Sequence, residues 1–375
     1  MNKLETFKIN FILYSTERTG GTRVILNYAN ELSSRGNEVS LTTIYHDPWF
    51  NLNSDVSVVA KKTKLSLYHF YASTLFLNKF GKTSISTEFS LLKKLLLMSP
   101  SSDINVATFF PTAYVSSWLA HKATPFYILM HDPDYFVKES IQKKFYNDTL
   151  FLPVNKVVNS TWLQKRVYDK TKEKCFMMNT GAVDTKIFKP VYDGSHKENE
   201  IHVVALGKGG SKNPKFIVNA VKEVKKRNPA INIFLHFFGH RLPKDIRLDS
   251  FIIFHKDLSD DKLAELYAMA DIQVTTSTAE SFPIPPLEAM ACGCTVITTP
   301  YGLEDYAIDG SNCLIVRPDA VQELVKQLEK LIFDPVLRKK LREEGFKTVR
   351  RFSYESQAVT LENLFRSESV SHALK

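Results

Sequence analysis

Short apolar runs alternate with amphipathic segments along most of the chain. In its first half the apolar runs cover residues 7–14, 38–44, 104–110, 125–131 and 154–159. Runs of this length that are apolar throughout are typical of strands buried on both faces of a sheet. Segments between them, such as TRVILNYANELSSRG (22–36), carry apolar residues at helical spacing. This alternation predicts a parallel sheet covered by helices.

A second series of the same kind follows a polar stretch at 191–200. Its apolar runs cover residues 201–207, 231–239, 251–255, 271–277, 294–299 and 312–316. Two such series predict two doubly wound α/β domains, which we place at 1–185 and 186–352. The last segment, 353–375, is predicted to be an amphipathic helix that returns to the first domain. The alternation of strands and helices does not assign residues 48–100 to either domain's sheet.

The composition of the chain is ordinary, but its charge is unevenly distributed. The 375 residues are 44% hydrophobic and 24% charged, which is ordinary for a globular protein. The net charge is +9, and residues 1–185 hold 22 Lys+Arg against 15 Asp+Glu, a net charge of +7. A basic half suits an anionic partner such as nucleic acid, acidic lipid or a phosphorylated substrate, and scattered solvated lysines explain it equally well.

Cysteine spacing and hydropathy indicate the compartment. The four cysteines show no disulfide framework, and Cys292 and Cys294 are too close together for a CxxC redox pair. The N-terminal residues lack the apolar segment of a signal peptide, and no run reaches the roughly 18 apolar residues of a spanning helix. We therefore expect a cytoplasmic protein, either soluble or peripheral at the inner face of the plasma membrane.

Ligands of doubly wound sheets bind beyond the carboxyl ends of the strands, so residues that directly follow a predicted strand are candidates for the site. Gly20 and Gly21 follow the first strand and precede a helix, whose free amides suit an anion or a sugar hydroxyl. His131 opens the sequence HDPD and could hold a polar ligand or a proton, or simply cap the strand. Asp132 and Asp134 raise a metal alternative, but a hard cation needs more converging oxygens than this loop offers.

A glycine-rich loop, GKGGSKNPKF, follows the strand at 201–207. Gly207 would let the backbone approach a ligand, and the ammonium groups of Lys208 and Lys212 at a helix N-terminus suit a diphosphate. The spacing matches neither GxGxxG nor GxxxxGK[ST], so it predicts neither a dinucleotide fingerprint nor a P-loop.

The stretch ESFPIPPLE (280–288) sets two carboxylates eight positions apart around three prolines. Pro285 and Pro286 suit the first turn of a helix, where a missing N–H costs nothing. Glu280 is then expected in the preceding loop and Glu288 early in the helix. Carboxylates accept hydrogen bonds from paired hydroxyls, so the two can hold a ribose at one end and a sugar at the other.

The segment ESFPIPPLEAMACGCTVITT resembles the E-x7-E signature of retaining glycosyltransferases of family 4, which have the GT-B architecture. The likeness extends to TGGTRVILNYANELSSRGNEV, VVNSTWLQKRV, NTGAVDTKIFKP and DLSDDKLAELYAMADIQVTTSTAESF, and covers nearly all of the chain except about 48–100. It implies two Rossmann-like domains with the active site in the cleft between them, the first binding the acceptor and the second the nucleotide sugar.

The resemblance also implies roles for individual residues. Glu288 would bind the ribose and Glu280 the donor sugar, while Lys208 and Lys212 would hold the diphosphate and His131 would lie at the donor sugar. The other implied binding residues are Gly20, Gly21, Gly207, Leu258, Ser281, Phe282, Pro283 and Ile284.

The sequence departs from the family pattern at several of these positions. Lys208 stands where arginine is usual and lacks its bidentate fork. Lys215 is an alternative to Lys212 because the loop is one residue short. Pro283 replaces a frequent glycine and removes an amide, leaving those of Phe282 and Ile284.

The implied function is transfer of a hexosyl or deoxyhexosyl group, with rhamnosyl among the candidates, from a nucleotide-diphosphate sugar to a lipid-linked saccharide in capsule or other surface polysaccharide synthesis. No metal, other cofactor or nucleic-acid partner is expected. The segment SLLKKLLL (90–97) is predicted to lie on an anionic membrane surface, unless Leu91, Leu92, Leu95 and Leu96 simply pack on the sheet.

Two alternatives stay open at this level. Basic and aromatic residues mix in KKTKLSLYHFYASTLFLNKF (61–80), as in a nucleic-acid-binding or DNA-sugar-transferring protein of the same architecture. Sugar epimerases and phosphorylases also share two Rossmann-like domains. We find no carboxylate acid/base set of the kind that an epimerase needs.

Overall fold

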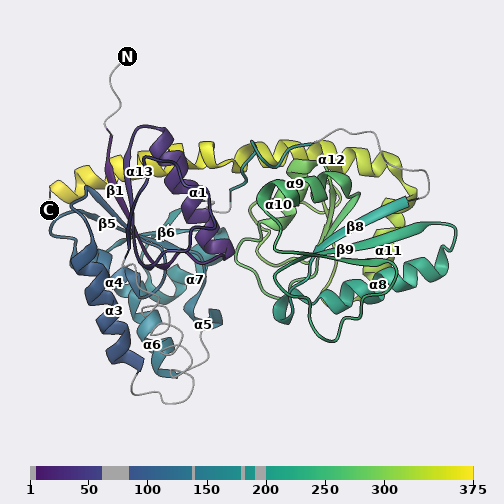
Figure 1. Ribbon diagram of the computed structural model, residues 1–375, viewed down its shortest axis with the longest axis horizontal. Coiled ribbons are helices and arrows are strands. Elements are labelled where there is room, and N and C mark those ends of the chain that lie inside the picture. The colour runs from purple at the N-terminus through teal and green to yellow at the C-terminus, as the bar shows by residue number, and fades with distance from the viewer. Residues whose placement is uncertain (1–5, 61–83, 137–139, 179–181, 191–199, 375) are drawn as a thin grey trace. The chain divides into compact units, whose positions relative to one another are not determined.

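The computed structural model describes residues 6–60, 84–136, 140–178, 182–190 and 200–374. The chain forms two compact units, Met1–Thr180 with Tyr354–Lys375, and Gly181–Ser353 (Figure 1). For comparison, the sequence places the domain boundaries at 185/186 and 352/353. The basic and aromatic segment 61–80 lies outside the described residues, so the nucleic-acid alternative that depends on it is not addressed by the fold.

The first unit is built on a parallel sheet of seven strands in the order β3-β2-β1-β4-β5-β6-β7. The strands are β1 (Lys8–Ser15), β2 (Glu38–Tyr45), β3 (Ser57–Ala60), β4 (Ile104–Ala107), β5 (Thr124–Leu129), β6 (Asn155–Val158) and β7 (Phe176–Met177). All five predicted strands are present. The sequence missed β3 and β7 because they are short and lie at the sheet edges, where little of either strand is buried.

Helices cover both faces of this sheet. They are α1 (Gly20–Ser34), α3 (Ser84–Met98), α4 (Thr112–Trp118), α5 (Pro133–Phe136), α6 (Ser140–Asp148), α7 (Thr161–Thr171) and α13 (Tyr354–Ala373). The last helix packs beside α1, with the Tyr28 and Tyr354 ring centroids 5.2 Å apart. It also reaches β5, where the rings of Phe365 and Phe126 are 4.8 Å apart. Residues after 353 therefore belong to the core of the first unit.

Helix α3 covers the other face of the same sheet. Its Leu91, Leu92 and Leu95 are 6%, 0% and 0% exposed and join one hydrophobic cluster with strands β1 and β2. These leucines therefore pack on the sheet, and the expectation that they enter a membrane interface is wrong. Lys93 and Lys94 between them are exposed.

The second unit has a parallel sheet of six strands in the order β10-β9-β8-β11-β12-β13. The strands are β8 (Glu200–Leu206), β9 (Asn232–Gly239), β10 (Ile252–Lys256), β11 (Ile272–Thr275), β12 (Thr295–Thr298) and β13 (Leu314–Ile315). Every one of them overlaps a predicted apolar run. The chain is thus α/β with two doubly wound sheets, as the sequence predicts.

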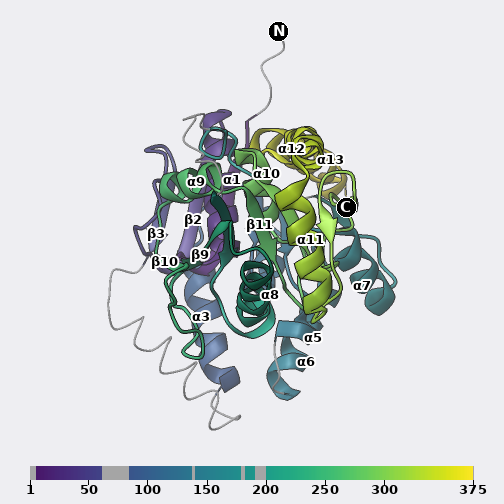
Figure 2. The same ribbon diagram turned by 90° about the vertical axis from the view of Figure 1, so that its right-hand side faces the viewer.

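Helices pack on both faces of the second sheet. Figure 2 shows α8 (Pro214–Arg227) and α11 (Val321–Phe333) side by side, and they share one hydrophobic cluster. Helices α9 (Asp260–Met269) and α10 (Pro285–Cys292) share the cluster on the other face. Helix α12 (Pro335–Val349) follows and contacts α10. Among the described helices of both units, none is long and apolar enough to cross a membrane.

The order of each sheet fixes where a ligand can bind. Connections leave β1 and β4 in opposite directions in the first unit, and β8 and β11 do the same in the second. The loops that follow two such strands diverge and open a crevice at the carboxyl edge of the sheet. The loops after β1, β8 and β11, next to these switch points, carry most of the binding residues that the sequence predicts, while His131 and Leu258 follow β5 and β10.

Candidate functional site

The loop after β8 requires glycine at its first position. The Gly207 amide donates to the carbonyl of Phe238 at 2.8 Å, which holds the loop against β9. A Cβ atom at this position would lie 3.0 Å from side-chain atoms of both Phe237 and Leu242. Any larger residue would push the loop away from β9. Lys208, which follows, is exposed.

Lys212 and Glu280 meet at the carboxyl edge between β8 and β11. Lys212 ends a single 3-10 turn, Gly210–Lys212, directly before α8, and its ammonium forms a salt bridge with Oε1 of Glu280. The same oxygen accepts a hydrogen bond from the Ser277 hydroxyl at 2.7 Å. The Lys212 and Glu280 side chains are 23% and 14% exposed, so the pair is partly desolvated and still within reach of a ligand.

Hydrogen bonds tie the loop after β11 to the loop after β8. The Thr276 hydroxyl donates to the carbonyls of Lys212 and Asn213 at 3.0 and 3.1 Å. The Thr278 amide donates to the carbonyl of Ser211 at 2.8 Å. Sequence reasoning missed these small polar residues. Their position directly after a strand, in the run TSTAES, was the signal that could have found them.

Gly302 is a further site residue that the sequence did not predict. Its φ is +69°, and a Cβ atom there would lie 2.8 Å from the carbonyl carbon of Ser281 and 2.9 Å from the carbonyl oxygen of Glu280. The loop after β12 therefore lies directly against the backbone that carries Glu280. No local signal in the sequence reveals this contact, because the two segments are far apart in the chain.

The helix after Glu280 begins where its prolines predict. Helix α10 starts at Pro285, and the Glu288 amide donates to the carbonyl of Ile284 at 3.0 Å to close its first turn. Glu288 lies in that turn and is 2% exposed, far more buried than Glu280. The two carboxylates thus lie in different environments, one in the loop and one in the base of the helix.

The Glu280 loop is held in place by the ring of Phe282 and by the backbone carbonyl of Pro283. Phe282 is buried, with its ring centroid 5.2 Å from that of Tyr306. The Tyr306 hydroxyl donates to the carbonyl of Pro283 at 2.7 Å. Ser281 is buried beside them, and Leu258, after β10, packs partly buried against the same hydrophobic cluster.

In the first unit, the loop after β1 leads straight into α1. Thr19 caps the helix, its hydroxyl accepting from the amide of Thr22 at 3.1 Å. A Cβ atom at Gly20 would meet nothing within 4 Å, whereas one at Gly21 would lie 3.4 Å from the sulfur of Met130. The structure therefore brings the glycine loop next to the residue that precedes His131.

His131 is exposed at the end of β5, and the aspartate after it is buried. Asp132 is 2% exposed and accepts from Nε of Arg166 at 2.7 Å and from Nζ of Lys170 at 2.6 Å. Asp134 accepts from Lys170 at 2.8 Å, and this hydrogen bond is the main reason that its pKa is lowered to about 2. Both carboxylates of the DPD sequence are thus bound by cations of α7.

The metal alternative for this loop finds no support in the geometry. The carboxylate oxygens that a hard cation would need accept hydrogen bonds from arginine and lysine. In the described part of either unit, no group of three or more His, Cys, Asp or Glu is placed to hold a metal ion.

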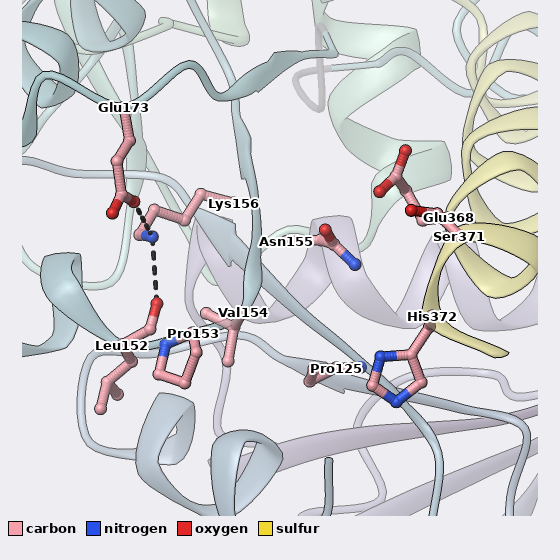
Figure 3. A pocket seen from close by; sticks show the side chains of 10 residues that line it. All are labelled: Pro125, Leu152, Pro153, Val154, Asn155, Lys156, Glu173, Glu368, Ser371 and His372. Atoms are coloured by element: carbon pink, nitrogen blue, oxygen red, sulfur yellow. Dashed lines mark hydrogen bonds and ion pairs between the residues drawn. The ribbon is translucent and has the colours of Figure 1, made fainter. Parts of the chain in front are cut away.

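A pocket of about 250 Å³ lies elsewhere in the first unit, at the amino ends of β5 and β6. Figure 3 shows Lys156 on its wall, bonded to the carboxylate of Glu173 at 2.8 Å and the carbonyl of Leu152 at 3.1 Å. His372 of α13 lines its other side. No predicted site residue lines this pocket, which lies at the opposite end of the strands from His131.

The second unit is similar in sequence to known proteins. Residues 193–348 match the family model of glycosyl transferases group 1. The chain is 24% identical over 221 residues to the D-inositol 3-phosphate glycosyltransferase of Corynebacterium aurimucosum, covering 53% of this chain and 52% of that protein. The chain spans about half the length of the curated relatives that it matches.

Two solved structures share the fold over nearly the whole chain. Sucrose-phosphate synthase from Thermosynechococcus elongatus has a TM-score of 0.72 at 17% identity, covering 97% of this chain and 99% of its own. The Anabaena protein HepE in complex with UDP-glucose has a TM-score of 0.72 at 14% identity, with coverage of 96% and 100%. This chain therefore has the fold of the GT-B glycosyltransferases, and its second unit is similar to the glycosyl transferases group 1 family.

Proposed function

We propose that the protein is a glycosyltransferase that moves a hexosyl or deoxyhexosyl group from a nucleotide-diphosphate sugar to a saccharide acceptor. The observation that carries this proposal is the cluster of Lys212, Glu280 and Ser277 at the carboxyl edge between β8 and β11. A cation and an anion fixed side by side match the two ends of a donor sugar phosphate. The family match of the second unit supports the same reaction class.

The charged site residues of the second unit have distinct roles in this proposal. Lys212 and the exposed Lys208 hold the diphosphate, and Glu280 accepts hydrogen bonds from hydroxyls of the donor sugar. Glu288, at the buried start of α10, orients the ribose. The salt bridge with Glu280 keeps the Lys212 ammonium aimed at the sugar–phosphate junction before the donor arrives.

The chemistry follows from the charge that develops during transfer. Breaking the anomeric C–O bond builds positive character on the sugar ring and negative charge on the departing diphosphate. Preorganised ammonium groups stabilise that negative charge, and they require no reorganisation during the reaction. We propose that the reaction retains anomeric configuration through front-face attack, in which the departing phosphate accepts the acceptor's proton. The acceptor binds to the first unit near Gly20 and Gly21, and His131 lies at the donor sugar.

We further propose that no metal ion takes part, because lysines fill the role that a divalent cation would have at the diphosphate. Turnover is expected to survive treatment with EDTA. Strict dependence on added Mg²⁺ or Mn²⁺ after dialysis would overturn the lysine assignment.

The most specific part of the proposal concerns the acceptor and the biological pathway. We propose a lipid-linked acceptor at the cytoplasmic face of the membrane, in surface polysaccharide synthesis such as that of a capsule, with a rhamnosyl donor among the candidates. The basic first unit and the exposed lysines of α3 support an anionic membrane partner.

Thermal unfolding in the presence of a panel of nucleotide sugars tests the reaction class. A donor at about 100 times its dissociation constant should stabilise the protein by about 2.7 kcal/mol. Protection by one nucleotide-diphosphate sugar, followed by release of its nucleoside diphosphate when acceptor is added, supports transfer. Protection by duplex or single-stranded DNA with no response to any nucleotide sugar would instead support the nucleic-acid alternative. Turnover that needs inorganic phosphate and no nucleotide would indicate a phosphorylase.

A further inference from the structure

The loop that carries His131 is fixed from both sides. On one side, the amide group of Asn159, which lies between β6 and α7, donates to the carbonyl of Met130 at 3.1 Å. On the other, the buried carboxylate of Asp132 accepts from Arg166 and Lys170. The residues directly before and after His131 are therefore anchored, while His131 itself is exposed.

The bonds to Asp132 come from a rigid element. Arg166 and Lys170 are four positions apart on α7, so they project from the same face of the helix. The helix begins at a fixed point, because the Ser160 hydroxyl accepts from the Leu163 amide at 3.2 Å. The Asp132 carboxylate also accepts from the amide of Asp134 at 3.0 Å, so one side chain links the helix to the turn after β5.

Asp132 makes more hydrogen bonds than are needed to end a strand. A buried carboxylate is costly unless it is paired and fully hydrogen-bonded, and Asp132 accepts three hydrogen bonds. A neutral turn residue would end the strand without that cost. A buried carboxylate at Asp132 is worth this cost if it fixes the position of the adjacent His131 side chain. Small displacements of reacting groups lower the reaction rate by large factors.

We infer that Asp132, held by Arg166 and Lys170, is a positioning residue that sets the place of the His131 imidazole for glycosyl transfer. This inference rests on the proposed function, in which His131 lies at the donor sugar. Asp132 is buried and does not touch the substrate. It acts through the backbone that it shares with His131, and α7 provides the fixed reference.

The test compares Asp132→Asn and His131→Ala, alone and combined, with kcat and KM measured for the nucleotide sugar. Asp132→Asn should lower kcat at least tenfold and change KM by less than about twofold, because a displaced histidine affects the transition state more than ground-state binding. The double variant should be no slower than His131→Ala within about twofold, since Asp132 acts only through His131. Multiplied losses in the double variant, or wild-type kcat in Asp132→Asn, would overturn the inference.

Matched variants separate positioning from loss of folding. Asp148→Asn removes an exposed aspartate of the same unit that pairs with Lys144, and it should leave kcat and thermal unfolding unchanged. Lys170→Arg keeps a cation on Asp132 and should retain most of the activity that Lys170→Met loses. If Asp132→Asn does not fold, the activities of Lys170→Arg and Lys170→Met test the inference instead. Equal activity of these two variants would overturn it.

A measurement without substrate distinguishes this inference from the proposed function. With isotope-labelled histidine, the His131 ring resonance is identified by its absence in His131→Ala. It should shift or broaden in Asp132→Asn and remain unchanged in Asp148→Asn. If no nucleotide sugar supports turnover, the proposed function fails, while an unchanged His131 resonance in Asp132→Asn would overturn the positioning role by itself.

Discussion

At the scale of single residues, the two glutamates of the ESFPIPPLE stretch differ in their surroundings. Glu280 is partly exposed and bonded to Lys212 and Ser277 in the loop, whereas Glu288 is buried in the first turn of α10. A carboxylate in a loop at the sheet edge can exchange partners when a sugar binds. A carboxylate at the base of a helix is held in one place, as an anchor for a ribose would be.

Replacing each glutamate by alanine should therefore have different consequences. Glu288→Ala should weaken binding of the nucleoside diphosphate, whereas Glu280→Ala should mainly lower kcat, because contacts to the sugar tighten as its ring flattens. Titration calorimetry with the nucleotide and steady-state kinetics measure the two effects. Glu265→Ala, in an exposed ion pair with Lys262 on α9, serves as the control. Equal losses of nucleotide affinity in both variants would contradict this division of roles.

At the scale of elements, the site of the second unit depends on loops that follow three different strands. The loop after β8 supplies Lys212, the loop after β11 supplies Glu280, and Gly302 of the loop after β12 lies against the backbone of Glu280. Neighbouring parallel strands place these loops at one edge of the sheet. A change in the supporting loop should therefore alter the chemistry without altering any residue that contacts substrate.

Two glycines of the same loop region test this dependence. Gly302 and Gly310 have φ of +69° and +70°, so alanine costs about 1–2 kcal/mol of backbone strain at either position. Only at Gly302 would the new Cβ clash with the backbone of Glu280 and Ser281. Gly302→Ala should lower kcat at least tenfold relative to Gly310→Ala at a temperature where both variants remain folded. Equal kcat values for the two variants would show that this contact does not position Glu280.

Three histidines form a chain of ring contacts across the neighbouring strands β8, β9 and β10 of the second sheet. His202 on β8, His236 on β9 and His255 on β10 are linked by two contacts of 3.0 Å between ring nitrogens. Burial is the main cause that lowers the pKa of His236 to about 4, and the neighbouring histidines lower it further. The His236 ring, which contacts a histidine through each of its nitrogens, must therefore stay neutral to donate from one nitrogen and accept at the other.

The histidine chain predicts how stability depends on pH. Because the folded pKa of His236 lies below its unfolded value of about 6.5, the unfolded state binds more protons between these values. The stabilisation is complete above pH 6.5 and is lost as the pH falls toward 4. Thermal unfolding at pH 7.0 and 4.5 should show a smaller drop for His236→Gln than for wild type. His240→Gln, at an exposed histidine, should keep the full drop.

At the scale of the whole molecule, charge and exposed apolar side chains meet on the outer face of α3, which we define as Phe89, Lys93, Lys94 and Leu97. Phe89 is 47% exposed and stacks on Trp118, which is itself 38% exposed, and Leu97 is 76% exposed. Phe89, Lys93 and Leu97 follow one another at four-residue spacing, so they share a stripe of the helix. Aromatic and basic side chains together suit the boundary of an anionic bilayer.

Sedimentation with lipid vesicles measures whether this face binds a membrane. The protein should pellet with vesicles that contain anionic lipid at low salt and stay in the supernatant at high salt or with neutral vesicles. Lys93→Glu with Lys94→Glu should abolish pelleting, since each lysine near the surface contributes about 1 kcal/mol. The same change at Lys339 and Lys340, an exposed pair on α12, is the control. Unchanged pelleting of the α3 variant would show that another surface binds, and no pelleting at all would favour a soluble acceptor.

Local patterns in the sequence were enough to predict most of the elements, although not the short edge strands β3 and β7. Apolar runs bounded by turn residues predict the strands, and Pro285 and Pro286 predict the start of α10, because backbone geometry at a proline depends only on that residue. The predictions of strands and of the helix start succeed because the forces involved act between residues that are close in the chain. The E-x7-E resemblance names Glu280 and Glu288 as a binding pair, and that assignment stays a prediction.

Contacts between distant segments were decided only by the tertiary structure. The sequence could not show that Asp132 is bound by Arg166 and Lys170, or that Gly302 supports Glu280, because each contact depends on how the strands are ordered in a sheet. For the same reason, the leucines of α3 suit a membrane surface and a buried core equally well by pattern. Burial is a property of the folded chain, and it was the packing of α3 on β1 and β2 that decided between them.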